Sequence, residues 1–308
     1  GRKINLKTIV QGVEMENRMF RQKTASGDAV TVIPSNVFVL NVDSSTVVHN
    51  GTVKPENADQ VVNEVEWRIR DGQMYKGNLA QLDLLANFDW KRPIYFVTGG
   101  NEGSLSLEDY FQFEGQAYRL VPIRTPNRNF FSYGRIDTEK LYDNLMNKFE
   151  WGGLGEEDVY IDYYNIRSTG VIKIRRNFVR LANKLLDEGD SVRAIKVLDK
   201  CMKLLPNWQV PYDHYISGLN YPVGKDRTQR VEGVIETYYR AGAIDKGNAL
   251  LLEFANILKQ DLLYYESLKE RFKPRFAEEA GQSQGLLQEC FMIARVYGHE
   301  DILNELYQ

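Results

Sequence analysis

The chain has 308 residues, of which 43% are hydrophobic and 26% are charged, which is enough for one large domain or two ordinary ones. Its 39 basic and 42 acidic residues leave a formal net charge of −3. This charge argues against nucleic acid as a partner, because phosphate binding needs a basic face, and no apolar run approaches the roughly 20 residues that span a membrane.

The first third of the chain has the pattern of short strands mixed with helices. Residues 6–20 are weakly helical, and Pro55 is typical of the start of a helix, here covering residues 55–65. Asn50-Gly51 favours a tight hairpin turn. Runs of β-branched residues predict strands at 29–33, 37–42 and 46–48.

The next segment repeats this alternation. Apolar spacing predicts a helix over 79–88, which Arg92-Pro93 ends because proline disfavours a helical residue before it. We then expect a buried strand at 94–98 that ends at Gly99-Gly100, a short helix at 107–113 and a strand at 118–123. Such an order predicts a small mixed α/β domain.

From Thr138 onward the apolar period becomes 3.6 residues, which predicts helices. The expected fold class is therefore α+β, with an all-α array after the mixed domain. We place the mixed domain at residues 1–136, a linker and connecting helix at 137–170, and the helical domain at 171–308. The cations Lys173, Arg175, Arg176 and Arg180 leave room for a local basic patch.

The helical part contains a tetratricopeptide-like unit, which is a pair of antiparallel helices with small residues where they touch. Gly189 falls at the turn between the two helices, where a left-handed residue is favoured. A weaker unit begins near Val231 and a third centres on Gly298, but their spacing exceeds the roughly 34 residues of a regular repeat. The signature residues are Phe178, Leu181, Ala182, Leu185, Ala194, Leu198, Cys201 and Pro206.

No residue pattern indicates a metal site or a cofactor. The three histidines, His49, His214 and His299, are scattered and lack the spacing of metal ligands. Gly152-Gly153-Leu154-Gly155 lacks the Lys-Ser/Thr of a phosphate loop and is treated as a linker. The acids of the 156–162 segment fit a solvated turn.

The two cysteines, Cys201 and Cys290, each lie on the apolar stripe of an expected helix. We interpret them as small buried hydrophobic residues. A disulfide bond between them has no support in the sequence.

Aromatic residues are abundant between Trp90 and Tyr133, and two interpretations of them stay open. Most of these rings fit a core, but an exposed set would bind a glycan or a peptide, with Arg124, Arg128 and Arg135 at its rim. The binding candidates in this block are Trp90, Tyr110, Phe111 and Arg124.

Three blocks of sequence carry a family resemblance. The chain resembles, over essentially its whole length, the soluble C-terminal region of a bacterial family of polytopic membrane proteins. That family, long catalogued as a domain of unknown function, is described as protein O-mannosyltransferase-like within the C-type glycosyltransferase superfamily. The blocks are Asp89-Trp90-Lys91-Arg92-Pro93-Ile94-Tyr95-Phe96, then Leu107-Glu108-Asp109-Tyr110-Phe111 with Gly115 and Tyr118-Arg119-Leu120-Val121-Pro122, and Tyr142-Asp143-Asn144-Leu145-Met146-Asn147-Lys148-Phe149-Glu150-Trp151-Gly152-Gly153.

The resemblance implies an extracytoplasmic, non-catalytic module. The catalytic acids of the family are expected in an N-terminal membrane half, so no catalytic residue is carried onto this chain. Because the chain begins with Gly1 and not Met, we expect the native N-terminus, and that membrane half, to lie upstream. The irregular segment 207–228 departs from a minimal helix connection and puts the geometry of the second repeat in doubt.

Three functional hypotheses follow. The leading one is an accessory domain of a membrane glycosyltransferase that engages acceptor polypeptide or a partner protein through the helical array, with Tyr212 and Tyr238 as candidate contacts. An alternative is glycan binding by the aromatic block 90–133, which requires Trp90, Tyr110 and Phe111 to be exposed. The third is a free-standing hydrolase that uses Glu108 or Asp109, although charges in the first turn of a helix explain these acids as well.

Overall fold

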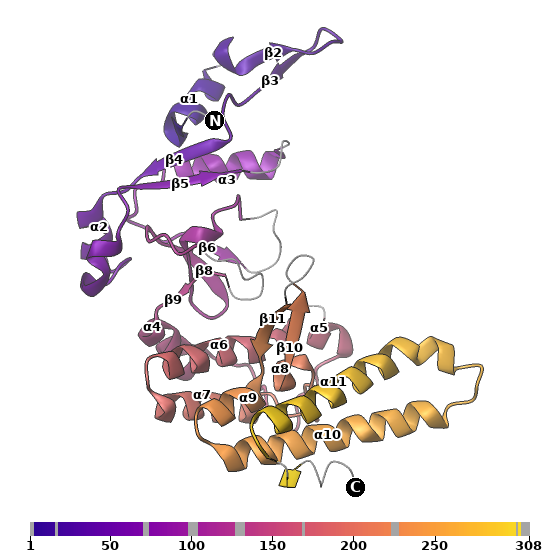
Figure 1. The fold of residues 1–308 in the computed structure, drawn as a ribbon. Helices are drawn as coiled ribbons and strands as arrows, with labels where there is room; N and C mark the ends of the chain where they lie inside the picture. The colour runs from indigo at the N-terminus through magenta and orange to yellow at the C-terminus, as the bar shows by residue number, and fades with distance from the viewer. Residues whose placement is uncertain are drawn as a thin grey trace. The chain divides into compact units, whose positions relative to one another are not determined.

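The computed structural model describes residues 3–15, 18–69, 74–97, 104–126, 133–167, 170–222, 228–299 and 301–302. The chain divides into two compact units, Gly1–Asp137 and Thr138–Gln308. Small sheets lie in the first unit and helices dominate the second, which confirms the α+β class (Figure 1). None of the helices among the described residues has the length and apolar character needed to cross a membrane.

The first sheet of the first unit has the strand order β1-β4-β5. Strand β1 (Ile4–Asn5) runs parallel to β4 (Val37–Asn41), and β5 (Glu64–Arg68) pairs with β4 in the antiparallel sense. Helix α1 (Leu6–Glu14) packs on β4 and on α3 (Lys76–Ala86), and the Phe38 ring of β4 stacks on Trp67. A separate, exposed hairpin is formed by β2 (Arg21–Lys23) and β3 (Ala29–Thr31).

The second sheet has the strand order β6-β8-β7-β9. Its two central strands are well covered. The strands are β6 (Tyr95–Val97), β7 (Phe111–Phe113), β8 (Ala117–Leu120) and β9 (Arg135–Ile136).

The strand expected at 94–98 is formed, but the expectation that it is buried was wrong. Strand β6 lies at the edge of the sheet, where β8 alone among the described strands pairs with it, and Val97 is 82% exposed. The residues expected to end this strand, Gly99 and Gly100, lie outside the described residues.

Residues 46–48 were expected in a strand but lie in helix α2 (Ser44–His49). The reason is local capping, because the carboxylate of Asp43 accepts hydrogen bonds from the backbone N–H groups of Ser45 and Thr46. Asn50 then ends the helix and Gly51 follows with φ of 71°, so the pair terminates a helix and does not form a hairpin turn.

Two further segments differ from the expected helices. Residues 55–65 form a 3₁₀ helix, η2 (Pro55–Gln60), and then enter β5, where Val65 and Trp67 point into the core between exposed residues. Residues 107–113 form the 3₁₀ turn η4 (Glu108–Tyr110) followed directly by β7. In both cases strand pairing takes over from the local helical tendency.

The second unit is mostly helical. It also contains one antiparallel hairpin, β10 (Gly218–Pro222) with β11 (Thr228–Glu232), which corrects the expectation of an all-α array. Its first strand lies within the segment 207–228 that looked irregular in the sequence, and its second strand begins at the last residue of that segment; Val223 and Gly224 lie outside the described residues. The α-helices are α4 (Thr138–Asp143), α5 (Tyr163–Arg167), α6 (Ile174–Asp187), α7 (Ser191–Leu204), α8 (His214–Ser217), α9 (Val234–Arg240), α10 (Ile244–Ser267) and α11 (Ala277–Val296). The π-helix η5 (Asn144–Lys148) follows α4, and η6 (Val171–Lys173) and η7 (Lys273–Phe276) are 3₁₀ helices.

Helices α6 and α7 form an antiparallel pair. Gly189 connects them with φ of 83°, and the Asp190 side chain caps α7 by accepting from the backbone N–H of Arg193. The signature residues that lie within the two helices are all fully buried, and Pro206, just after α7, is half-buried, which explains the pattern as the core of the pair. Because Arg175 and Arg180 of α6 are also buried, the basic patch considered from the sequence is not formed.

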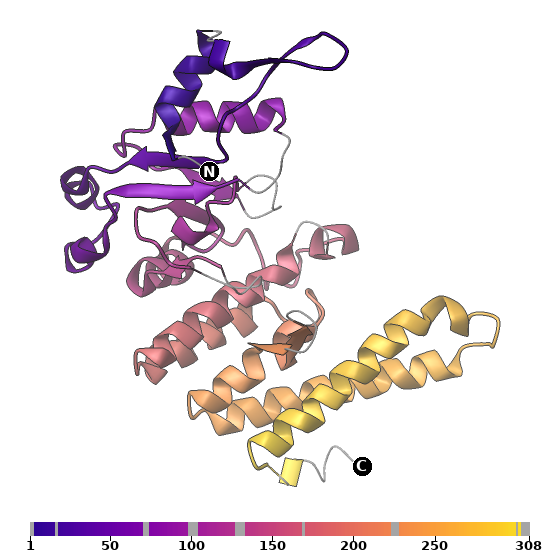
Figure 2. The same cartoon turned by 45° about the horizontal axis from the view of Figure 1, so that its top comes forward.

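A second pair, α9 and α10, is joined through Gly242 with φ of 78°. Helix α10 has 24 residues, and α11 returns along it as a long helical hairpin (Figure 2). Burial in α10 stops at Leu258, so the part of the helix after this residue takes no part in the core.

Candidate functional site

The aromatic candidates of the first unit lie in its core. Trp90, Tyr110 and Phe111 are each at most 3% exposed. The Trp90 indole N–H donates to the backbone carbonyl of Asn41 at 2.9 Å, and the Tyr110 hydroxyl lies 3.2 Å from both the backbone carbonyl and the N–H of Glu66. These bonds satisfy the polar ends of the rings, as buried aromatic residues require.

Phe111 lies at the centre of a ring cluster in the second sheet. Its ring centroid is 4.7 Å from Phe96, 5.5 Å from Tyr118 and 6.3 Å from Tyr133. A ring without an exposed face cannot stack on a sugar. The glycan-binding alternative required exposed rings at Trp90, Tyr110 and Phe111, and this requirement is not met. Phe130 and Phe131, which belong to the same predicted block, and the predicted rim residue Arg128 lie outside the described residues.

The acids of the hydrolase hypothesis have structural partners. Asp109 accepts from the Arg124 guanidinium at 3.3 Å, and Arg124 is the exposed member of the predicted binding set. Glu108 accepts from the Ser104 hydroxyl. Among the described residues, no group of three or more His, Cys, Asp or Glu side chains is arranged to hold a metal ion.

The two tyrosines predicted for the helical array face inward. Tyr238 on α9 is buried, and its hydroxyl donates to Asp199 at 2.9 Å; burial and the nearby Asp199 carboxylate raise its pKa. Tyr212 is half-buried, with its ring 5.9 Å from Phe254 and the Arg175 guanidinium 5.2 Å from the ring centre. Both side chains hold the array together and do not form an open face.

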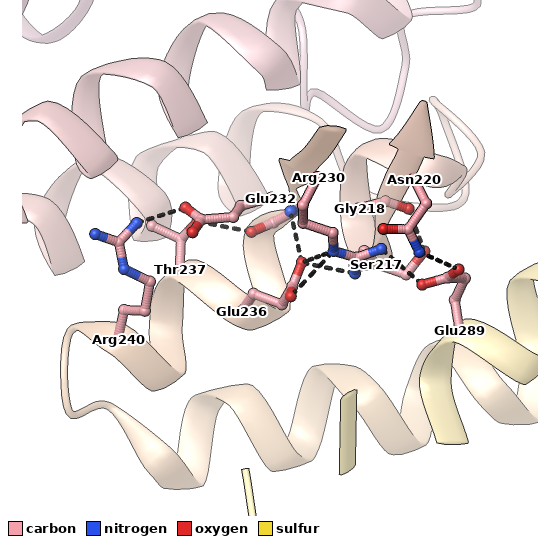
Figure 3. Close-up of polar contacts among 10 residues, drawn as sticks. Ser217, Gly218, Asn220, Arg230, Glu232, Glu236, Thr237, Arg240 and Glu289 are labelled. Atoms are coloured by element: carbon pink, nitrogen blue, oxygen red, sulfur yellow. Dashed lines mark hydrogen bonds and ion pairs between the residues drawn. The ribbon is translucent and has the colours of Figure 1, made fainter. Parts of the chain in front are cut away.

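A network of charges that sequence reasoning missed joins the β10–β11 hairpin to two helices (Figure 3). Arg230 on β11 contacts Glu236 of α9 at 2.8 Å, Glu289 of α11 at 2.7 Å and the backbone carbonyl of Ser217 at 2.9 Å. Asn220 of β10 also donates to Glu289. Since Glu289 lies 59 residues from Arg230 and the residues follow no motif, no local signal could have indicated the whole network.

The electrostatics of this network indicate a structural role, in which a permanent charge holds the hairpin to the two helices. Burial alone would lower the pKa of Arg230, but hydrogen bonds and charge from Glu236 and Glu289 outweigh burial and raise it. The guanidinium is thus a fixed cation shared by two carboxylates. Gly233 permits the close approach, because a Cβ there would lie 2.3 Å from the backbone nitrogen of Gly218.

An exposed tyrosine segment, defined here as residues 156–165, lies before and within α5 of the second unit. Tyr160, Tyr163 and Tyr164 are 87%, 67% and 68% exposed. Such a concentration of large exposed rings is the informative exception on a protein surface. The acids of the segment are Glu156, Glu157, Asp158 and Asp162.

The base of this segment is held in place by the buried side chain of Gln209. Its amide accepts from the backbone N–H of Gly155 at 2.7 Å and donates to the carbonyl of Val159 at 2.8 Å. Gly155 has φ of 85°, and a Cβ there would lie 2.7 Å from the carbonyl oxygen of Lys203. The exposed tyrosines therefore lie on a segment that is anchored to the chain that follows α7.

Comparison with known proteins gives a match that covers the first unit. Residues 1–140 match the family model of TMEM260-associated domain 2, so the match spans the two sheets and ends in α4. No curated protein and no solved structure matches the chain.

Proposed function

We propose that this chain is a non-catalytic accessory region of a membrane-bound glycosyltransferase of the protein O-mannosyltransferase-like class. The observation that carries the proposal is the match of residues 1–140 to a domain associated with TMEM260, a protein O-mannosyltransferase-like family. The sequence blocks of the resemblance around Trp90 and Tyr110 fall inside the matched range. In this proposal a membrane half precedes the chain, and the chain lies on the extracytoplasmic face.

The proposed role is to engage the acceptor polypeptide. The helical unit supports this role because paired helices, such as α6–α7 and α9–α10, are the elements from which peptide-binding arrays are built. Since Tyr212 and Tyr238 face inward, the contact is assigned to the exposed tyrosine segment. Exposed tyrosines are common at recognition surfaces, since they supply large contact areas at low entropy cost. The surrounding acids favour a basic acceptor segment.

A peptide array probed with the intact chain tests this role. We expect selective binding of peptides rich in Lys and Arg, and loss of that binding in the triple variant Tyr160→Ser, Tyr163→Ser, Tyr164→Ser. The matched control is the triple variant Met15→Ser, Tyr75→Ser, Leu84→Ser, which removes comparably exposed apolar side chains from the first unit. Binding that both variants retain, or selective binding of glycans instead of peptides, would contradict the proposal.

A further inference from the structure

The distal half of the α10–α11 hairpin has no buried side chains. No residue between positions 259 and 282 is buried, and the structure describes every one of them. The buried residues of α10 lie before this stretch and those of α11 lie after it. Figures 1 and 2 both show the hairpin extending beyond the other helices of the second unit.

The hairpin tip, defined here as residues 263–276, exposes apolar side chains. Leu263 and Tyr264, close to the end of α10, are 66% and 57% exposed, and Phe272 in the connecting turn is 40% exposed. A short protruding segment with large exposed side chains of this kind indicates a contact surface.

The same tip is basic. It contains four cations and two acids, Glu266 and Glu270, in a chain whose net charge is −3. Glu270 is held by Lys273 at 2.5 Å, and the Arg271 guanidinium lies 4.6 Å from the centre of the Phe272 ring. Glu278 and Glu279 follow in the first turn of α11, where the positive end of the helix offsets their charge. The four cations are Lys269, Arg271, Lys273 and Arg275.

An apolar groove continues from the tip between the two helices. It has a volume of about 690 Å³ and is lined mainly by Leu262, Tyr265, Phe276, Ala280, Leu287 and Phe291, with Lys273, Glu266 and two glutamines also at its wall. Apolar surface thus extends behind the exposed side chains, with one cation and one acid at its wall.

From these features we infer that the hairpin tip is a docking element for an anionic lipid surface. The tip alternates cations with aromatic and aliphatic side chains. Its cations would bind the negatively charged headgroups, and its apolar side chains would insert at the boundary with the acyl chains. Aromatic rings with a polar end, such as Tyr264, are favoured at that boundary.

Vesicle flotation with the full chain tests this inference. We expect binding to vesicles of phosphatidylcholine mixed with phosphatidylglycerol, no binding to phosphatidylcholine alone, and weaker binding at high salt. The variant Lys269→Glu, Arg271→Glu, Arg275→Glu should weaken the apparent affinity on the order of a hundredfold. The variant Leu263→Ser, Tyr264→Ser, Phe272→Ser should lose the binding that survives at high salt.

The control variant, Lys7→Glu, Lys76→Glu, Lys196→Glu, makes the same charge change at exposed lysines outside the tip. Because the tip is not buried, all variants should keep the wild-type helical spectrum and melting temperature. Equal loss of binding in the tip and control variants would overturn the inference, as would absence of binding to any anionic vesicle. Binding of soluble polyglutamate through the tip without binding of vesicles would also overturn it, in favour of an acidic polypeptide.

Discussion

Arg175, whose side chain is fully buried, donates a hydrogen bond from its guanidinium to the backbone carbonyl of Leu205, 2.9 Å away. The same guanidinium donates to the carbonyls of Val210 and Pro211, and the carboxylate of Asp213 lies 3.8 Å from it. Burial lowers the pKa of Arg175, and Asp213 opposes this effect. Arg175 therefore fastens the start of α6 to the chain that leaves α7.

Replacement of Arg175 by methionine should destabilise the protein strongly. The apolar volume is largely kept, but buried carbonyls lose their donors, so we expect the free energy of unfolding to fall by about 3–5 kcal/mol. Urea denaturation followed by circular dichroism measures this change. The control Arg295→Met, at an exposed position of α11, should shift stability by less than about 0.5 kcal/mol. Equal effects of both variants would refute the anchoring role.

Gly233 should not tolerate alanine. A Cβ at this position would lie 2.3 Å from the Gly218 nitrogen and 2.4 Å from the Ile216 carbonyl oxygen, both of which are backbone atoms. We expect Gly233→Ala to cost about 1–3 kcal/mol, because the β10–β11 hairpin must move away from α9.

Gly285 offers the matched control for this substitution. It lies in the interior of α11, and a Cβ there meets nothing within 4 Å. Gly285→Ala should therefore stabilise the protein by up to about 1 kcal/mol, since alanine favours helix more than glycine does. Thermal unfolding of both variants checks the pair, and a stabilising Gly233→Ala would disprove the close approach.

Asp43 should make the stability of α2 depend on acid pH. Hydrogen bonds from Ser45, and then from Thr46, lower the pKa of Asp43 from 3.8 to about 2. A carboxyl group with a lowered pKa in the folded state stabilises the protein above its unfolded pKa, and this contribution is lost as the pH falls from about 4 to 2. Chemical denaturation across this pH range should show a shallower slope for Asp43→Asn than for the wild type.

The same variant contains its own control at neutral pH. Asparagine is as good an N-cap as aspartate, so Asp43→Asn should match the wild-type stability closely at pH 7. If the free energy of unfolding fell equally steeply with pH in wild type and variant below pH 4, the Asp43 carboxylate would not be the cause of the acid dependence.

Cys201 and Cys290 should be unreactive in the folded protein. Both thiols are free and buried, and burial raises the pKa of each to about 12. Since the thiolate is the reactive form, we expect no alkylation by iodoacetamide at pH 8 and complete alkylation of both in denaturant. Mass spectrometry of the intact protein reads this directly, and rapid labelling of either cysteine in native buffer would be inconsistent with the described burial.

The sequence by itself determined the features that rest on local periodicity. The α+β class, the helix α3 and the helix pair α6–α7 followed from apolar spacing and from a glycine at the turn. These signals are reliable because neighbours along one helix face share the same environment, whichever partner covers that face. The buried cysteines belong to this group, because each lies on such a face.

Tertiary structure decided what each side chain meets. It placed Trp90 and Tyr110 in the core and so decided between the two interpretations of the aromatic block that the sequence left open. It also brought Arg230, Glu236 and Glu289 together from separate elements and left the end of the α10–α11 hairpin uncovered. Burial and charge pairing depend on contacts between residues far apart in the chain, and such contacts exist only once the elements have packed.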